Sequence, residues 1–379
     1  MPELPFASVA FLWPSLAAAS ASQMILAMAE GMAKFAQGVE RAEAVEPEWG
    51  TPNAVALDLP TMRLRDFSTG HDAIATLVCT PFALHDATIV DLAQRHSLVA
   101  ALTQAGLARL FVSHWRSATP SMRFLSIDSY LADLNVVIDE LGGKANLIGL
   151  CQGGWLALAY SARFPNKVHK LVLAAAPVDI AAGESKLSRL AASMPLSVFN
   201  ELVRLGEGRI IGARVRHLWG PSDMSPEAIA DALQIAEPSE YPAYLEARFR
   251  QWHAWTVNLP GTYYLQVVDR LYKRNQLARG QFVALGRCVD LRLVRAPLFL
   301  LAAEQDEVVS AEQLFAVRRL VGTKSDRIDL ATVPCGHLGL FMGSRTLERT
   351  WPRIVRWLLD RRPATPRAAN APVREHGSV

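Results

Sequence analysis

Residues 149–154 read Gly-Leu-Cys-Gln-Gly-Gly and directly follow an apolar run at 145–148. This pattern predicts a buried strand, a sharp glycine turn and a helix, which together form an elbow that presents a nucleophile. Small neighbours let the strand and the helix approach closely, and the strained turn lifts the Cys151 sulfur above the sheet edge. The helix N-terminus beneath it favours a thiolate or an oxyanion. A tight turn around a buried structural cysteine would show the same short pattern.

The composition is that of a large globular chain without a bias toward nucleic acid. Of 379 residues 51% are hydrophobic, which is enough for one large core and an inserted subdomain. A formal net charge of +3 is too small to indicate a nucleic-acid partner. Cys79, Cys151, Cys288 and Cys335 form no C-x-x-C pair, so neither a metal site nor a disulfide framework is expected. A reactive thiol suits a reducing cytosol, and we expect a cytoplasmic protein.

The first 52 residues differ from the rest of the chain. Apolar residues at helical spacing between 15 and 42 predict an amphipathic helix, packed on the domain or on a second subunit. The alternative is an adhesive face for a lipid or polymer surface. Because no basic region precedes the apolar stretch and Pro14 interrupts it, neither a signal peptide nor a transmembrane segment is expected. The Pro-, Ala- and Arg-rich residues 361–379 are expected to be disordered.

Residues 53–360 show the rhythm of an α/β domain. Short apolar runs without polar alternation predict parallel strands that helices cover on both faces. These runs are 75–79, 110–113, 145–148, 170–175, 297–303 and 327–331. The helices expected among them are 97–106, 126–141, 311–321 and 344–360. Residues 178–285 break the rhythm, are rich in Trp and Tyr, and predict a helical lid inserted over the carboxyl ends of the strands.

Two further residues complete a catalytic set with Cys151. Asp306 follows the apolar run at 297–303, and His337 follows the last predicted strand. Nucleophile, acid and histidine in this chain order, each after a strand, are typical of the α/β-hydrolase fold. Cys151 would attack an acyl carbonyl, His337 would take its proton, and Asp306 would hold the histidine tautomer.

Each member of this set has a structural alternative. Asp306 could cap the helix expected from residue 311, which would leave Glu304 or Glu307 as the acid. His337 lies in a glycine-flanked turn, where a surface histidine is also expected. The convergence of all three at strand ends favours the catalytic interpretation.

The oxyanion hole is expected to combine two backbone N–H groups. One belongs to Gln152 and the other to the loop after the first buried strand, from Ala83 or Leu84. His85, in the same loop, is expected to contact substrate unless it is solvated.

Three tryptophans are further candidates for contact with substrate. Trp115 follows another predicted strand and could form the floor of the site, with structural packing as the alternative. Trp252 and Trp255 lie in the predicted lid.

With these residues in view, residues 75–359 resemble the polyhydroxyalkanoate synthases and the related intracellular polyhydroxyalkanoate depolymerases. The Gly-Leu-Cys-Gln-Gly-Gly run is similar to the synthase form of the lipase box. The other segments that follow the synthase pattern are 91–99, 111–116, 122–130, 258–261, 277–280 and 289–291. The resemblance implies an α/β-hydrolase fold and a triad of Cys151, Asp306 and His337, with the growing chain held as a thioester on the cysteine.

The back half of the chain departs from the synthase pattern. Synthases usually carry an Asp three residues after the cap tryptophan, where this chain has Trp255 after Trp252. Residues 263–266, 336–345 and 351–354 look as much like the depolymerases.

The resemblance implies that 3-hydroxyacyl-CoA is the acyl donor and that the enzyme needs no other cofactor. Hydrolysis of the polymer is the alternative, and a granule-associated partner subunit without catalysis is a second one. A polyhydroxyalkanoate granule surface is an expected partner, and we expect either a homodimer or a second subunit.

Overall fold

The computed structural model describes residues 45–71, 73–219, 224–235 and 243–360. The amphipathic helix expected near residues 15–42 and the tail expected at 361–379 lie outside these ranges and stay predictions. Within the described ranges, no helix is both long and apolar enough to cross a bilayer.

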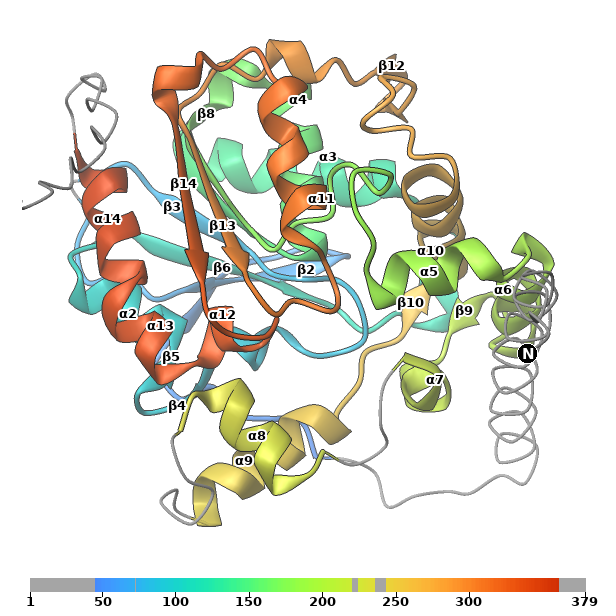
Figure 1. Ribbon diagram of the computed structural model, residues 1–379, viewed down its shortest axis with the longest axis horizontal. Coiled ribbons are helices and arrows are strands. Elements are labelled where there is room, and N and C mark those ends of the chain that lie inside the picture. Colours follow the sequence, from blue (N-terminus) through green and yellow to red (C-terminus); the bar gives the residue numbers. More distant parts are fainter. Residues whose placement is uncertain (1–44, 72, 220–223, 236–242, 361–379) are drawn as a thin grey trace, which may run out of the picture.

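A sheet of eight strands runs through the centre of the domain (Figure 1). The spatial order is β1 (Ala54–Asp58), β2 (Met62–Asp66), β6 (Leu110–Trp115), β3 (Thr76–Cys79), β7 (Ala145–Leu150), β8 (Val168–Ala174), β13 (Leu298–Ala303) and β14 (Ile328–Val333). The strands from β6 to β14 pair in parallel, whereas β1 and β2 form an antiparallel edge. The predicted mostly parallel α/β sheet is therefore confirmed, and β1 and β2 are additions to it.

The parallel strands are apolar at successive positions because helices cover both faces of the sheet. Leu147 belongs to the core that includes residues of α3 and α4, and Ile148 belongs to the core that includes residues of α2 and α14. Figure 1 shows α14 and α2 on one side and α3, α4 and α11 on the other. The bounds are α2 (Leu98–Gln104), α3 (Ile127–Glu140), α4 (Gln152–Arg163), α11 (Ala311–Phe315) and α14 (Trp351–Leu359).

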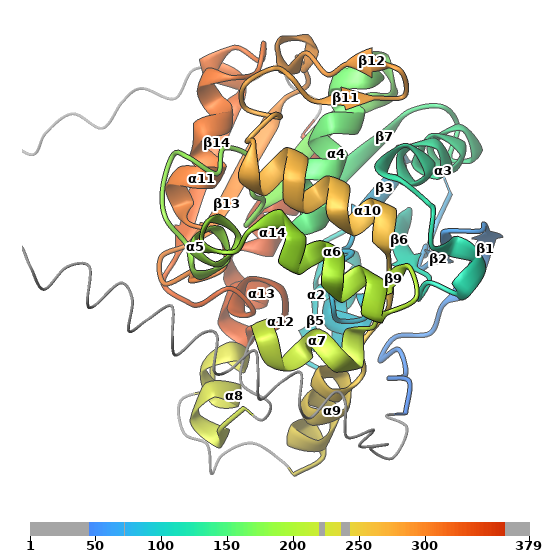
Figure 2. The ribbon, with the colours of Figure 1, turned by 90° about the vertical axis from the view of Figure 1, so that its right-hand side faces the viewer.

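The chain between β8 and β13 leaves the sheet and forms a largely helical layer, which Figure 2 views from the side of α6 and α10. Its helices are α5 (Lys186–Ser193), α6 (Leu196–Leu205), α7 (Gly212–Trp219), α8 (Pro226–Leu233), α9 (Ala243–Ala254), α10 (Gly261–Gln266) and the π-helix η5 (Val267–Lys273). In Figure 1, α8 and α9 lie beyond the arrowheads of β13 and β14. The layer thus begins where the strands end.

Short strands interrupt this layer. The strand β9 (Arg209–Ile210) pairs with β10 (Leu259–Pro260), and β11 (Val283–Ala284) pairs with β12 (Arg287–Cys288). The β9–β10 pair is not part of the sequence prediction, because two residues are too few to carry a periodic signal. A further hairpin, β4 (Asp91–Ala93) with β5 (His96–Ser97), precedes α2.

Two helices expected to be continuous are broken. The helix expected over 344–360 is two helices, α13 (Ser344–Arg349) and α14, which meet at Thr350. Pro352 stands at the start of α14, where its missing N–H costs nothing but where it cannot continue a preceding helix. The helix expected over 311–321 is α11 followed by a 3-10 turn, η7 (Ala316–Arg319).

The turn from β7 to α4 holds Cys151 in a strained backbone conformation. Its φ of 47° and ψ of −118° lie outside the regions that residues with a Cβ usually adopt. The Cys151 N–H donates to the Ala174 carbonyl at 2.9 Å, and the Cys151 carbonyl accepts from the Gly154 N–H at 2.9 Å. The first bond holds the elbow on the end of β8, and the second closes the first turn of α4.

Close backbone contacts explain the glycines of the elbow. A Cβ on Gly153 would lie 2.1 Å from the Cys79 carbonyl oxygen, and one on Gly154 would lie 2.3 Å from the Ala176 Cβ. A Cβ on Gly149 would lie 2.6 Å from the Gly154 Cα. Because real atoms do not approach so closely, α4 reaches its place beneath Cys151 only without these side chains.

We predict that Gly153→Ala lowers the free energy of unfolding by about 1–3 kcal/mol, since the Cys79 carbonyl and α4 must move apart. Urea unfolding measures this change. Gly70→Ala is the matched control, because its Cβ would meet the Ala108 Cβ at an ordinary 3.5 Å. We expect the control to stay within about 0.5 kcal/mol of wild type. Equal stability of the two variants would contradict the close-contact explanation.

Candidate active site

Two loops at the carboxyl ends of β13 and β14 are joined by their backbones. The Glu304 N–H donates to the Val333 carbonyl at 2.9 Å, and the Gln305 N–H donates to the Cys335 carbonyl at 3.1 Å. This pairing extends the parallel ladder by two residues beyond the strands. It brings the next side chain of each loop, Asp306 and His337, to one place.

The Asp306 carboxylate is held on both oxygens. Its Oδ2 accepts a hydrogen bond from His337 Nδ1 at 2.8 Å. Its Oδ1 accepts from the backbone N–H groups of Val308 at 2.8 Å and Val309 at 2.9 Å. Only 1% of the Asp306 side chain is exposed. The carboxylate therefore fixes the His337 ring so that Nδ1 carries a proton and Nε2 faces away from Asp306.

The two glutamates considered as alternatives to Asp306 do not contact His337. Ser310 caps α11 through its side chain, so Asp306 is not the cap of that helix. Glu307 forms an ion pair with Lys186 at the surface, and Glu304 is exposed. The structure brings Asp306, and neither glutamate, to His337.

The Cys151 thiol completes the cluster. It is 6% exposed, and it is close enough to His337 to affect the pKa of the imidazole. Burial disfavours the imidazolium, but the negative charges of Asp306 and Cys151 and hydrogen bonds to both outweigh burial and raise the pKa of His337 well above 6.5. The surroundings of His337 thus favour its protonated form.

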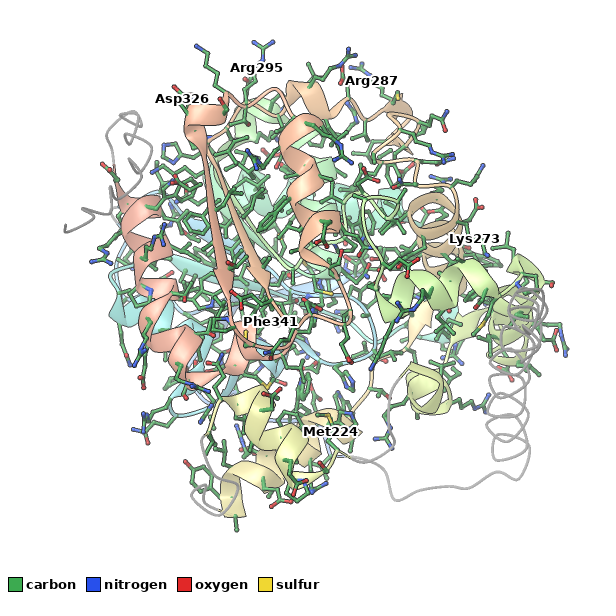
Figure 3. All side chains as sticks on the ribbon, in the orientation of Figure 1. Met224, Lys273, Arg287, Arg295, Asp326 and Phe341 are labelled. Atoms are coloured by element: carbon green, nitrogen blue, oxygen red, sulfur yellow. The ribbon has the colours of Figure 1, made fainter. Side chains whose placement is uncertain are left out.

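Phe341 packs against this cluster from the chain that follows it. It lies on α12 (Gly339–Met342), and its ring meets the His337 ring edge-on with centroids 5.3 Å apart. Figure 3 labels Phe341 near the ends of β13 and β14. An apolar wall beside the histidine leaves 13% of the His337 side chain exposed.

The side chain of Gln152 contacts a residue that the sequence analysis did not single out. Gln152 Oε1 accepts from the Trp155 indole N–H at 2.8 Å, and Nε2 donates to the Tyr272 hydroxyl at 2.6 Å. Tyr272 lies on the π-helix η5, and π-helical turns occur often at functional sites. The sequence carries no motif for such a turn, and Tyr272 is one of several tyrosines in the insertion.

The loop after β3 passes close to the insertion. The Leu84 carbonyl accepts from the Val257 N–H at 2.8 Å, and Ala83 and Leu84 are half-buried. The His85 ring packs against the Trp252 ring at a tilt, with centroids 4.7 Å apart. Burial, and then His253, lower the pKa of His85 to about 3, so the ring is neutral. The oxyanion role of Ala83 or Leu84 with Gln152, and the contact of His85 with substrate, stay predictions.

The structure buries two of the three candidate tryptophans. Trp252 is 1% exposed, and its indole N–H donates to the Asp86 carbonyl at 3.2 Å. Trp115 is buried, and its indole N–H donates to the Thr80 carbonyl at 2.8 Å. Both hold the loop after β3 from within the core, which agrees with the packing alternative for Trp115, and the contact of either with substrate stays a prediction. Trp255 is half-buried, and its contact with substrate stays a prediction.

A cavity of about 230 Å³ lies next to these tryptophans. Trp255, Trp115, His114 and Arg116 are among its walls, whereas the triad is not. Nowhere in the described ranges do three His, Cys, Asp or Glu side chains gather as they would around a metal ion.

Comparison with known proteins agrees with this geometry. Residues 92–344 match the family described as alpha/beta hydrolase fold, and because the match spans more than half of the chain, the chain belongs to that family. The inhibitor-bound epoxide hydrolase of Bacillus megaterium superposes with a TM-score of 0.52 at 16% identity, covering 80% of this chain and 98% of that one. At this identity the structural likeness shows the fold alone.

The chain is also similar to curated polymerase sequences. The chain is 28% identical to the poly(3-hydroxyalkanoate) polymerase subunit PhaC of Synechocystis sp., over 72% of this chain and 74% of that protein. It is 25% identical to the subunit of the same name from Allochromatium vinosum, over 72% of this chain and 77% of that protein. The resemblance to the polyhydroxyalkanoate synthases is thereby confirmed, and the chain is an enzyme of acyltransferase or hydrolase type.

We predict that Asp306→Asn lowers the pKa of His337, because the carboxylate charge stabilises the imidazolium. NMR titration of histidine-labelled protein measures the change, with the His337 signal assigned through His337→Gln. Glu307→Gln is the control, since Glu307 pairs with Lys186 and not with His337. An unchanged His337 midpoint in Asp306→Asn would contradict the electrostatic role of Asp306.

Proposed function

We propose that this protein is a cysteine-dependent acyltransferase that polymerises 3-hydroxyacyl-CoA through a thioester on Cys151. The observation that carries the proposal is the 2.8 Å hydrogen bond between Asp306 and His337, together with the strained elbow that presents Cys151 and the effect of Cys151 on the pKa of His337. The similarity to polymerase subunits along most of the chain supports the choice of substrate.

In the proposed reaction, His337 takes the proton of Cys151 and the thiolate attacks the carbonyl carbon of the acyl-CoA. The backbone N–H of Gln152, at the start of α4, and one from Ala83 or Leu84 would stabilise the oxyanion. The C–S bond to CoA breaks, and the CoA thiol leaves with the proton from His337. The hydroxyl of a second hydroxyacyl-CoA then gives its proton to His337, and its oxygen attacks the carbonyl carbon of the thioester. The bond from that carbon to the Cys151 sulfur breaks, His337 returns the proton to the sulfur, and the released acyl-CoA is longer by one ester.

The reaction uses CoA only as part of the substrate and needs no further cofactor. Asp306 remains ionised and stabilises the imidazolium at each proton transfer. Water in place of the second hydroxyl would convert the same intermediate to a free acid, which is the reaction of a depolymerase. The identity of the attacking group therefore separates the two activities, whereas the acyl-enzyme step is common to both.

We predict that the protein releases CoA from 3-hydroxybutyryl-CoA with growth of polymer, and that Cys151→Ala abolishes both. Asp306→Asn should slow CoA release roughly 10⁴-fold, as expected when a histidine loses its orienting carboxylate. Thiol release and polymer mass measure the two products. Cys288→Ala is the control, because Cys288 is exposed and distant in the chain from the elbow.

The possible outcomes separate the alternatives. Release of hydroxybutyrate from amorphous polyhydroxybutyrate, without polymer growth from the CoA substrate, would identify a depolymerase and contradict the proposal. No turnover of either substrate would favour a partner subunit without catalysis.

We further propose that the enzyme works in the cytoplasm on granule surfaces, as part of a homodimer or with a second subunit, and that residues 1–44 supply adhesion. Deletion of these residues should reduce co-sedimentation with amorphous polyhydroxybutyrate and leave turnover of soluble 3-hydroxybutyryl-CoA unchanged. Deletion of residues 361–379 is the control. Unchanged co-sedimentation would contradict the adhesive role, and a chain that no longer folds would support packing of the segment on the domain.

A further inference from the structure

The oxygen of the Tyr272 hydroxyl accepts a hydrogen bond from the side-chain amide of Gln152. The Trp155 indole N–H is a donor only, so the Gln152 atom that it meets at 2.8 Å must be the carbonyl oxygen Oε1. This fixes the orientation of the amide and turns its NH₂ group toward Tyr272. The Tyr272 oxygen therefore accepts a hydrogen bond from Gln152 Nε2 at 2.6 Å.

The same hydroxyl can also donate a hydrogen bond, and its acceptor is the next question. The hydrogen bonds found in the described ranges give Tyr272 no protein acceptor. Gln152 directly follows Cys151, so its side chain joins the tyrosine to the nucleophile elbow. Burial, and then the charge of Cys151, raise the pKa of Tyr272 above its usual range. The phenol therefore stays protonated and acts as a donor, not as a base.

The backbone around Tyr272 is anchored on both sides. Lys273 Nζ donates to the carbonyls of Ala191 at 2.8 Å and Met194 at 2.5 Å, at the end of α5. Figure 3 labels Lys273 beside this helix. Asn275, in the left-handed region at φ 48°, donates from Nδ2 to Asp179 at 2.7 Å. These bonds tie both sides of the π-helical turn to neighbouring parts of the fold.

We propose that the Tyr272 hydroxyl donates a hydrogen bond to the Cys151 sulfur when it is a thiolate, with Gln152 as the residue that positions the phenol. Tyr272 then stabilises the nucleophile from the insertion, while His337 stabilises it from the loop after β14. This inference deepens the proposed function, because it rests on Cys151 as the nucleophile of that reaction. It also gives the inserted layer a chemical contribution to the site.

The pH dependence of Cys151 alkylation tests the proposal without any acyl substrate. Iodoacetamide reacts with the thiolate, and peptide mass spectrometry gives the rate at Cys151 separately from that at exposed Cys288. Loss of a hydrogen bond to a charged group should shift the alkylation midpoint of Tyr272→Phe upward by about one pH unit. The limiting rate at high pH should stay that of wild type.

Tyr160→Phe is the matched control. The Tyr160 hydroxyl donates to Asn135 Oδ1 at 3.2 Å, so this change also removes one hydroxyl and one hydrogen bond from a tyrosine that packs on the domain. We expect its midpoint to equal that of wild type. Gln152→Ala removes the amide that positions the phenol but keeps the backbone N–H of residue 152. It should also shift the alkylation midpoint upward, by a smaller amount than Tyr272→Phe.

Coincident profiles for Tyr272→Phe, Tyr160→Phe and wild type would overturn the proposal. If Tyr272→Phe does not fold, Gln152→Ala with an unshifted midpoint would overturn it equally. Slower acyl transfer with an unshifted midpoint would place the hydroxyl on the substrate and also contradict it. A shifted midpoint in a protein that transfers no acyl group would support the hydrogen bond and refute the proposed function.

Discussion

The close approach of helix α4 to the ends of β3, β7 and β8 is the constraint on which the site depends. Three glycines permit it, and the strained backbone at Cys151 is its consequence. The surrounding hydrogen bonds and packing maintain that conformation against its cost. Without this approach, the sulfur would not stand above the sheet edge, and the helix N-terminus would not lie beneath it.

Asp306 and His337 lie at the same edge of the sheet as Cys151, but a different feature of the backbone positions them. Backbone pairing continues past β13 and β14 into their loops, so Asp306 and His337 meet without strain at either residue. The site therefore combines a strained nucleophile with a relaxed and buried acid–histidine pair. The first sets the position of the sulfur, and the second sets the charge that faces it.

The sequence predicted the six parallel strands because helices cover both faces and leave continuous apolar runs. It also predicted the residues that meet at Cys151, since chain order and strand ends suffice for that. It missed β1, whose residues are mostly exposed, and β2, in which arginines alternate with buried apolar residues in place of a continuous apolar run. It missed the contact of Tyr272 with Gln152, because contacts within the insertion depend on packing that no local pattern encodes.

The most direct test of the account is the mass of the Cys151 peptide after rapid acid quench of the enzyme with 3-hydroxybutyryl-CoA. The account predicts one or more added hydroxybutyryl groups on this peptide, removable by hydroxylamine as a thioester requires. Turnover of the substrate with an unmodified Cys151 peptide at every quench time, or with the acyl group on another residue, would contradict it.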